Sequence, residues 1–249
     1  DCLLSRGLGD VYKRQMHRLF EKYRKTVLAI ATHRSFLQNR IMSTVYLSTA
    51  YFAPVSYYAS FLRYDRIVIE QWCNYTKQTY RNRCHIAGAN GLLALSVPIV
   101  KPDTIKCPTK DIRISDHGEW RHLHWNAIAS AYGSSPFFEY YQDDIRPFFE
   151  KRYEFLLDFN EEIRRTVCNL IGLEPHIEYS SSYSEPAPGE TDLRDAIHPK
   201  KRKAETILPV QPKPYYQVFS EKYGFQPDLS IIDLLMNMGP ESILILQNA

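Results

Sequence analysis

The chain has 249 residues, 44% of them hydrophobic and 24% charged, which is ordinary for a globular domain and enough for one sizeable core. Its net charge of +3 is unevenly spread, because residues 1–41 hold nine Lys or Arg against three acids while the remainder holds 22 basic and 25 acidic residues. That slightly acidic remainder excludes binding to nucleic acid through bulk positive charge.

Cysteine usage and hydropathy narrow the class of protein further. Five cysteines with no CxxC pair argue against a disulfide framework and against a zinc site. The apolar run VLAIA near the N-terminus is far too short to span a bilayer, and no small-residue cleavage site follows it. We therefore expect a cytoplasmic protein without a transmembrane segment.

The N-terminal residues need separate treatment. Residues 1–15, DCLLSRGLGDVYKRQ, resemble a read-through peptide that recurs at the ends of unrelated proteins translated from assembled environmental DNA, so we exclude them from fold reasoning. Residues 16–41 are either a native leader or upstream sequence translated in frame, which makes the start Met16 or Met42. Strand-like sequence begins at Met42, and residues 42–249 are expected to form one domain.

From Met42 onward the pattern predicts a strand, a turn at Pro54, a short helix and a second strand around the β-branched residues 67–69. Residues 80–100 predict a hairpin whose turn is residues 88–91, and residues 105–116 predict another short strand. A strand–helix–strand opening followed by further strands favours a single α/β domain with a mixed sheet covered by helices.

Helical spacing dominates the middle of the chain, in residues 119–132 and again in residues 144–159. A third helix is expected to begin at a capping box, Asp158-x-x-Glu161, and to end at Gly172. Residues 178–214 are rich in Ser, Pro and charge, and they predict a long, partly mobile loop. The basic run PKKRK within it either holds phosphates or is simply solvated.

Three blocks of sequence carry a family resemblance. The first joins TAYFAPVSYYA to YDRIVIEQ and KQTYRNRCHIAGANG, the second is WRHLHWNAIASAYGSSPFFEYY, and the third is FQPDLSIIDLLMNMGP. Their order resembles the WbqC-like family of bacterial proteins, often encoded among genes for O-antigen and other surface polysaccharides. The chain departs from many members, which have Gln-Pro in place of Thr49-Ala50 and paired aspartates in place of Glu70-Gln71.

The resemblance implies a role in polysaccharide biosynthesis, for which transfer of glycine or another small acyl group to a sugar has been suggested. We favour a group-transfer enzyme that moves an aminoacyl or acyl group to an amino sugar and takes a small-molecule or nucleotide-sugar substrate. The alternative is a non-catalytic module that binds a nucleotide sugar or serves as a scaffold, which the lack of a nucleophile motif supports. An ATP-dependent amide ligase would need a phosphate-binding loop, and none is evident.

A pocket is expected where the three blocks meet, near Tyr51, Glu70, Arg83, His124 and Asp233. Arg83 and Asn82 are candidate ligand-binding residues, because an arginine fork suits a phosphate or carboxylate and an amide reads a hydroxyl or carbonyl.

The two arginines of the YRNR stretch differ in this expectation. If residues 80–86 form a strand, Arg81 and Arg83 share one face while Asn82 lies on the other. Arg83 then either contacts a ligand or packs on tyrosines at a solvated face, and Arg81 is the weaker candidate.

Two further residues are candidate acids or bases. Glu70 ends an apolar strand, where open α/β sheets place ligand contacts, so its carboxylate is a candidate general base. The alternative is an exposed acid paired with Lys77, itself a candidate ligand-binding residue. His124, on the apolar side of its helix, is either a proton shuttle or a hydrogen-bonded core histidine.

Asp233 interrupts an apolar helix and forms a polar stripe with Ser230 and Asn237 at helical spacing. The stripe either lines a pocket, with Asp233 catalytic and Asn237 binding the ligand, or forms the solvent face of an amphipathic helix. The histidines lack partners at metal-ligand spacing, so we expect no metal, and no motif indicates a cofactor.

Overall fold

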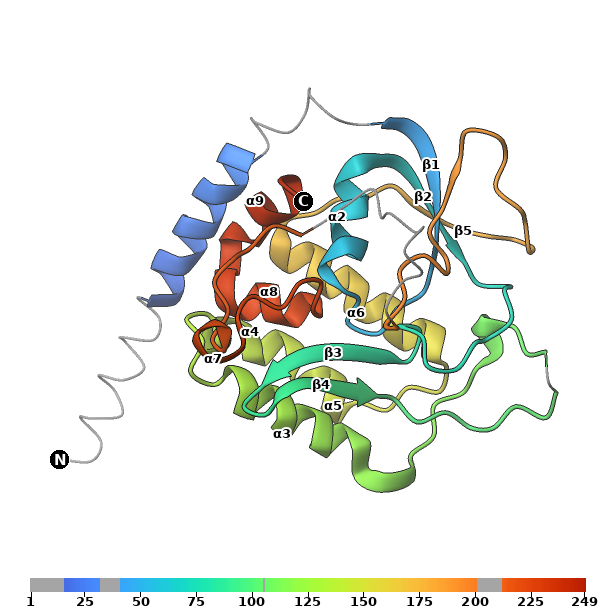
Figure 1. Cartoon of the computed structure of the whole chain (residues 1–249), viewed down its shortest axis with the longest axis horizontal. Helices are drawn as coiled ribbons and strands as arrows, with labels where there is room; N and C mark the ends of the chain where they lie inside the picture. Colours follow the sequence, from blue (N-terminus) through green and yellow to red (C-terminus); the bar gives the residue numbers. More distant parts are fainter. Residues whose placement is uncertain (1–15, 32–40, 105, 201–211) are drawn as a thin grey trace.

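A computed structural model describes residues 16–31, 41–104, 106–200 and 212–249 of the chain (Figure 1). Its main sheet has four parallel strands in the order β5-β2-β1-β6. The strands are β1 (Ile41–Ser48), β2 (Tyr64–Glu70), β5 (Ile177–Tyr179) and β6 (Thr191–Asp192). Helix α2 (Val55–Arg63) joins β1 to β2, so that their last residues, Ser48 and Glu70, lie opposite each other.

The strand–helix–strand unit forms because β1 and β2 are apolar on both faces. Val45, Leu47, Ile67 and Ile69 have no exposed surface and belong to the main core, and Val68 on the opposite face is also buried. Strands covered on both faces appear in sequence as continuous apolar runs, as the residues around 67–69 do. The expected single α/β domain is confirmed.

The predicted hairpin is also confirmed, and it lies outside the parallel sheet. Strand β3 (Arg83–Gly88) pairs antiparallel with β4 (Gly91–Ser96) across a two-residue turn. Gly91 has a φ of 101°, which a residue with a Cβ rarely adopts. Figure 1 shows the hairpin below the parallel sheet, next to α3 (Trp120–Tyr132).

The expectation of one strand over residues 80–86 is wrong. Strand β3 begins only at Arg83, and Arg81 and Asn82 lie in the turn before it. Two contacts keep the chain in this turn: the Tyr80 carbonyl accepts from the Tyr51 N–H at 2.9 Å, and the Asn82 amide donates to the Val97 carbonyl at 2.8 Å. Arg81 and Arg83 therefore do not share a strand face.

The helical middle of the chain is divided more finely than expected. After α3 come α4 (Phe138–Ile145), α5 (Pro147–Glu150) and α6 (Leu156–Ile171). Residues 144–159 are thus not one helix, because Pro147 starts a new helix and residues 151–155 are extended or bent. Gly172 ends α6 with a φ of 77°, as predicted.

Two other local expectations are wrong. Residues 106–116 contain a short 3-10 helix, η1 (Thr109–Asp111), and isolated bridges instead of a strand. Helix α6 begins two residues before Asp158, so no capping box forms. Glu161 lies inside the helix, where its carboxylate accepts a hydrogen bond from Arg164 at 2.7 Å.

Residues 178–200 contain structure where a loop was expected. The two-residue strand β6 pairs with β1 through Val45 and Tyr46 and completes the parallel sheet. Two residues are too few to give a periodic signal in sequence. Residues 201–211 of the expected loop, with most of the basic run, lie outside the described residues.

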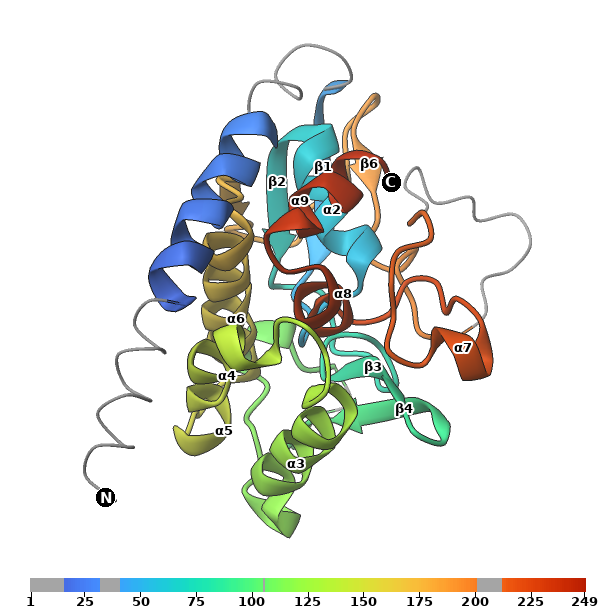
Figure 2. The same cartoon turned by 90° about the vertical axis from the view of Figure 1, so that its left-hand side faces the viewer.

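The C-terminal segment and the leader pack on the same core. Beyond η2 (His117–Glu119) and α7 (Ser220–Tyr223), the remaining helices are α8 (Ile231–Met238), η3 (Gly239–Glu241) and α9 (Ser242–Gln247). Residues 16–31 form a helix beside α6 (Figure 2), and its Phe20 ring stacks on Tyr140 of α4 at 4.3 Å. Within the described residues, no helix has the length and apolar character to cross a membrane.

Candidate functional site

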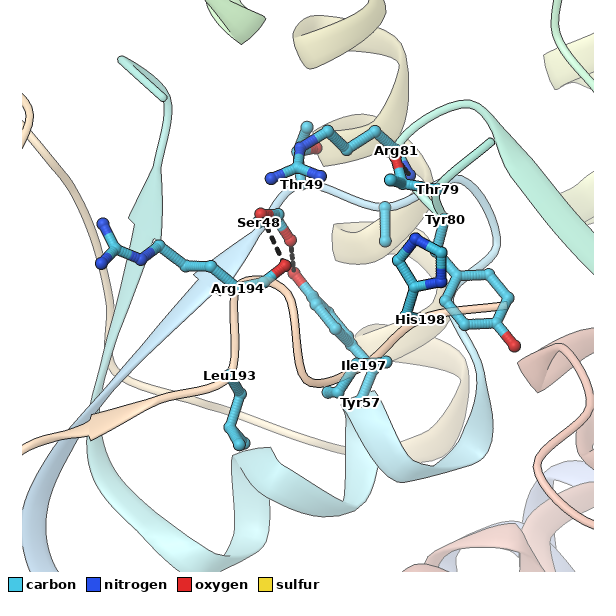
Figure 3. Close-up of a pocket in the computed structure, with 11 residues that line it drawn as sticks. Ser48, Thr49, Tyr57, Thr79, Tyr80, Arg81, Leu193, Arg194, Ile197 and His198 are labelled. Atoms are coloured by element: carbon cyan, nitrogen blue, oxygen red, sulfur yellow. Dashed lines mark hydrogen bonds between the residues drawn. The ribbon is translucent and has the colours of Figure 1, made fainter. Parts of the chain in front are cut away.

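A small pocket lies at the carboxyl edge of the parallel sheet, between the ends of β1 and β6. The chain leaves β1 toward β2 on one side, while β6 lies on the other side of β1. Open α/β sheets bind ligands where strand connections diverge in this way. Figure 3 shows Ser48 and Thr49 at the end of β1, with Arg81 and His198 facing them from two other segments. We call this space the sheet-edge pocket.

A larger space lies next to the sheet-edge pocket. The pocket itself has a volume of about 10 Å³, room for about one water molecule. Tyr80 and His198 also line a second cleft of about 500 Å³, together with His85, Lys200 and residues 227–229. This outer cleft has the size of a small-molecule binding site. The two spaces therefore share one wall and are adjacent.

Arg81 is the cation of the sheet-edge pocket. Its side chain is 4% exposed, and Figure 3 shows its guanidinium extending toward Ser48 and Thr49. Its Nη2 donates to Asp195 at 3.3 Å and to the Cys73 sulfur at 3.6 Å, both long contacts. Within the described residues its buried Nε has no hydrogen-bond partner. A buried donor left unpaired is costly, so a water molecule or a ligand group that accepts from this Nε would be stabilising.

His198 supplies a neutral hydrogen-bond donor to the same pocket. Burial lowers the pKa of His198; the negative charge of Asp195 opposes this shift, and the positive charges of Lys200 and Arg81 add to it. Its Nδ1 accepts a hydrogen bond from the Lys200 backbone N–H at 3.1 Å. In a neutral imidazole the proton must then be on Nε2. Within the described part of the chain, this leaves Nε2–H as the donor that His198 can offer to a ligand.

Glu70 adjoins the pocket from β2. Its Oε1 accepts from the Trp72 N–H at 2.7 Å and from the Ser180 hydroxyl at 2.8 Å, while Oε2 lies 3.8 Å from Arg194 Nη1. Oε2 has no hydrogen-bond partner in the described part of the chain. Arg194 is held instead by Asp192, at 2.6 Å from Nη2, and its guanidinium points away from the pocket in Figure 3. Glu70 thus keeps an acceptor oxygen available.

A buried ion pair supports the pocket from α6. The Glu161 carboxylate accepts from Arg164 Nε at 2.7 Å and from the Tyr179 hydroxyl at 2.7 Å. Its other oxygen lies 3.5 Å from the Thr49 hydroxyl in the pocket floor. Next to it, Asn160 donates to the Arg81 carbonyl at 2.8 Å. Helix α6 therefore holds two parts of the pocket in place, the backbone at Arg81 and the side chain of Thr49.

The N-terminus of α2, where many α/β folds hold a phosphate, is already occupied. The Asp228 carboxylate accepts from the Ser56 N–H at 2.8 Å and from the Ser56 hydroxyl at 3.0 Å. The Leu229 carbonyl accepts from the Val55 N–H at 3.0 Å. Because protein groups satisfy these N–H donors, they cannot also bind a phosphate. Anion binding at this edge therefore falls to Arg81.

A family model described as the WbqC-like protein family matches residues 49–245. The chain belongs to this family. Over 214 residues it is 25% identical to a protein of Mycobacterium tuberculosis (strain ATCC 25618 / H37Rv) named "Uncharacterized protein Rv1507c". The alignment covers 77% of this chain and 89% of that protein. No solved structure matches the chain.

Most residues that define the sheet-edge pocket of this WbqC-like protein lie inside the matched region. Thr49, Arg81 and His198 all fall within residues 49–245, and Ser48 immediately precedes them. The first sequence block supplies Thr49 and Arg81, but His198 comes from the long segment expected to be a loop. The pocket therefore joins a motif to a segment outside the three blocks.

The expected pocket residues Tyr51 and His124 meet in the core of the WbqC-like fold. The Tyr51 hydroxyl and His124 Nδ1 are 2.9 Å apart, and both side chains are buried. Burial lowers the pKa of His124 to about 4, so the imidazole is neutral at pH 7. Trp120 and Phe149 pack on its ring. Tyr51 and His124 are therefore packed among aromatic rings in the core.

Asp233 and Asn237 lie in a second buried cluster. The Asp233 carboxylate accepts hydrogen bonds from Tyr132 at 2.9 Å, Tyr215 at 2.7 Å and Gln217 at 2.9 Å. Burial raises the pKa of Asp233, although these donors oppose the shift. Asn237 donates to the Asp233 carbonyl at 2.8 Å. The expectation of a solvent-facing stripe is wrong, because Ser230, Asp233 and Asn237 are all buried.

The remaining expected site residues lie on the hairpin side and on a surface turn. Arg83 is partly buried and donates to the Ser96 hydroxyl at 2.8 Å, which ties β3 to β4. Lys77 is exposed, and Glu70 pairs with Arg194 rather than with Lys77. In the described part of the chain, Tyr51, Glu70, Arg83, His124 and Asp233 thus make their hydrogen bonds in separate clusters, where only Tyr51 and His124 contact each other.

Sequence reasoning placed Arg81 below Arg83 and did not select His198, Thr49 or Arg194. The order of the two arginines as candidates is reversed by the turn at residues 81–82. Because of this turn the Arg81 side chain is buried, while Arg83 is part of hairpin strand β3. No local pattern around Arg81 distinguishes it from Arg83, because Thr79 and Tyr80 before it also suit a strand. Within the described residues, no group of three or more His, Cys, Asp or Glu could hold a metal ion.

Proposed function

We propose that this chain is a group-transfer enzyme that moves an aminoacyl or acyl group to an amino sugar in the assembly of bacterial surface polysaccharides. Membership in the WbqC-like family supports the part of the proposal that concerns polysaccharide assembly, because the family resemblance described above implies that role. The observation that carries it at the level of chemistry is the junction of the sheet-edge pocket and the outer cleft at Tyr80 and His198. Transfer between two substrates needs two adjacent binding spaces.

The proposed reaction joins the amine of the acceptor to the acyl carbon of the donor. A C–N bond forms, and the bond from the acyl carbon to its leaving group breaks with the electron pair departing on the leaving group. The amine proton passes to a base. Negative charge that develops on the acyl oxygen needs a hydrogen-bond donor. We assign this role to Nε2–H of His198, which stands where the two spaces meet.

We assign the proton acceptor to Glu70, one of three residues that sequence analysis put forward as a base. It adjoins the pocket through Ser48, its partner in the sheet, and Arg194, and its Oε2 is without a hydrogen bond among the described residues. Asp233 and His124 are assigned positioning roles instead, because Asp233 already accepts three hydrogen bonds and His124 is bonded to Tyr51.

Activity tests the proposal directly. The purified protein would be mixed with amino sugars, as free sugars and as nucleotide sugars, and with acyl-coenzyme A or aminoacyl thioesters. Mass spectrometry would detect the N-acylated sugar. Replacing Glu70 with Gln is expected to reduce kcat by about 10²- to 10⁴-fold, because Gln cannot take the proton.

A matched control comes from the same sheet. Glu178 lies on the neighbouring strand β5 and pairs with Arg66 at the surface, so Glu178→Gln is expected to leave kcat unchanged. Equal loss in both variants would mean that Glu70 has no specific role. Binding of a single nucleotide sugar, with no product from any donor, would contradict transfer and favour a recognition module.

A further inference from the structure

Three arginines are buried near the carboxyl edge of the sheet, and they differ in how their charge is matched. Their side chains are 4%, 8% and 7% exposed for Arg81, Arg164 and Arg194. Arg164 has the buried Glu161 at 2.7 Å, and Arg194 has Asp192 at 2.6 Å with a second contact from Nε at 2.9 Å. Among the described residues, the carboxylate nearest to Arg81 is that of Asp195, at 3.3 Å. The charge of Arg81 is the least compensated of the three.

The carboxylate nearest to Arg81 is poorly placed to be a permanent partner. Asp195 is 80% exposed, and it contacts only Nη2 through one oxygen. Exposed ion pairs of this kind are weak, since water competes for both partners. An incoming anion can therefore displace the Asp195 carboxylate from Arg81 at little cost in free energy.

The shape and donors of the pocket select among anions. A planar carboxylate matches the fork of an arginine through two parallel hydrogen bonds, and the unpaired Nε offers one of the two donors needed. A phosphate of charge −2 needs several donors around it, but the N–H groups at the start of α2 are already bonded to Asp228 and Leu229. The pocket has room for about one water molecule, so either anion needs more space than it offers, and displacement of the Asp195 carboxylate from Arg81 must provide it.

We propose that the sheet-edge pocket binds the carboxylate of a small substrate, with the fork of Arg81 as its partner and Asp195 as the group it displaces. The inference deepens the proposed function, on which it rests for treating this pocket as a substrate site. It implies that one of the two substrates carries a free carboxylate at the end that enters the sheet edge, while the rest of the molecule extends past His198 into the outer cleft.

Binding of simple probes tests the inference without any assay of turnover. Glycine and acetate would be titrated into the full-length protein by NMR, with glycinamide and inorganic phosphate as comparators. We expect glycine and acetate to bind with dissociation constants on the order of millimolar, as suits such small ligands, and glycinamide not to bind. Phosphate should bind more weakly than acetate.

Substitutions of Arg81 and of its contact partner Asp195 make the test specific. Arg81→Gln should weaken acetate binding at least about tenfold, because hydrogen bonds to a charged group are lost. Asp195→Asn removes the competing carboxylate at an exposed position and should tighten binding by about two- to fivefold. Arg113→Gln, at an exposed arginine paired with Glu154, should change neither.

The inference is overturned by equal binding of glycine and glycinamide, by undiminished binding in Arg81→Gln, or by weaker binding in Asp195→Asn. The Asp195 variant keeps the test decisive if Arg81→Gln fails to fold, since an exposed side chain is not needed for folding. Carboxylate binding that depends on Arg81, with no acyl transfer by the protein, would leave this site standing and reject the proposed function. Transfer with no carboxylate binding would reject this site alone.

Discussion

The cluster around Asp233 and the sheet-edge pocket both bury a charge, but they do so in opposite ways. Both carboxylate oxygens of Asp233 accept hydrogen bonds, from Tyr132 on one and from Tyr215 and Gln217 on the other. Arg81 is comparably buried, yet its Nε is unpaired within the described chain and its carboxylate partner is exposed. Among the described residues, the charge of Asp233 is fully hydrogen-bonded and that of Arg81 is not.

This difference separates structural from functional polar groups. A buried charge with all its hydrogen bonds made holds segments together, as Asp233 holds α8 against residues 215–217. A buried charge without them lowers stability, and folded proteins tolerate such costs mainly at sites that bind something. From the sequence, Asp233 is a candidate catalytic residue and Arg81 is a weak candidate. The sequence shows a polar residue within an apolar run, but it does not show which donors surround that residue in the fold.

The largest expected effect tests the contrast among buried arginines. Arg164→Met should lower the free energy of unfolding by about 3–5 kcal/mol, because it leaves Glu161 buried without its cation. Arg81→Met should change it by less than about 1 kcal/mol or raise it, because a poorly compensated buried cation is removed. Urea unfolding followed by circular dichroism measures both. Equal losses in the two variants would make Arg81 a structural residue.

A second test uses the neutral histidine beside Tyr51. The folded protein holds the pKa of His124 at about 4, below the ordinary value near 6.5, so the unfolded chain binds a proton first as the pH falls. Stability from this residue is therefore present above pH 6.5 and is lost between pH 6.5 and about 4, in total about 3 kcal/mol. His124→Gln should flatten the pH dependence in that window. An unchanged slope in the variant would contradict the assignment.

The smallest expected effect on stability is that of a substitution at Asp233, the fully hydrogen-bonded charge of the comparison. Asp233→Asn replaces one acceptor oxygen by an NH₂ group that meets a tyrosine or glutamine donor, and should cost about 1–3 kcal/mol of unfolding free energy. The loss is limited because Asn avoids burying a charge, the cause of the raised pKa of Asp233. Acetate binding at Arg81 should stay within about twofold of the parent, since the two clusters share no partner. A coupled loss of binding would join the two regions into one site.

Much of the fold was predictable because its signals are local. The apolar runs of β1 and β2, the glycine-rich turn at residues 88–91 and the stop at Gly172 each depend on a few adjacent residues. Helix α6 shows the limit of such signals. Asp158 and Glu161 have the spacing of a capping box, but Leu156 and Leu157 are buried and extend the helix beyond it.

The candidate site was less predictable, because its parts come from four separate segments. Ser48 and Thr49 lie at the end of β1, Tyr57 lies on α2, Arg81 lies in a turn, and His198 lies beyond a two-residue strand that leaves no pattern. The sequence indicated that Glu70 ends a strand, and the structure places it at the end of β2, fully buried beside Ser48. It could not say that Arg194, more than a hundred residues away, would be its cation.

By itself the sequence determined the α/β class, the strand–helix–strand opening, the hairpin and membership in the WbqC-like family, since periodicity and ordered motifs are properties of neighbouring residues. Only the tertiary structure decided which polar residues are satisfied. Whether a buried charge finds its partner depends on residues that are far apart in the chain, such as the 79 residues between Arg81 and Asn160 and the 114 between Arg81 and Asp195, and no local spacing encodes that. For this reason Arg81 replaces Arg83 as the residue on which the chemistry of the pocket is expected to depend.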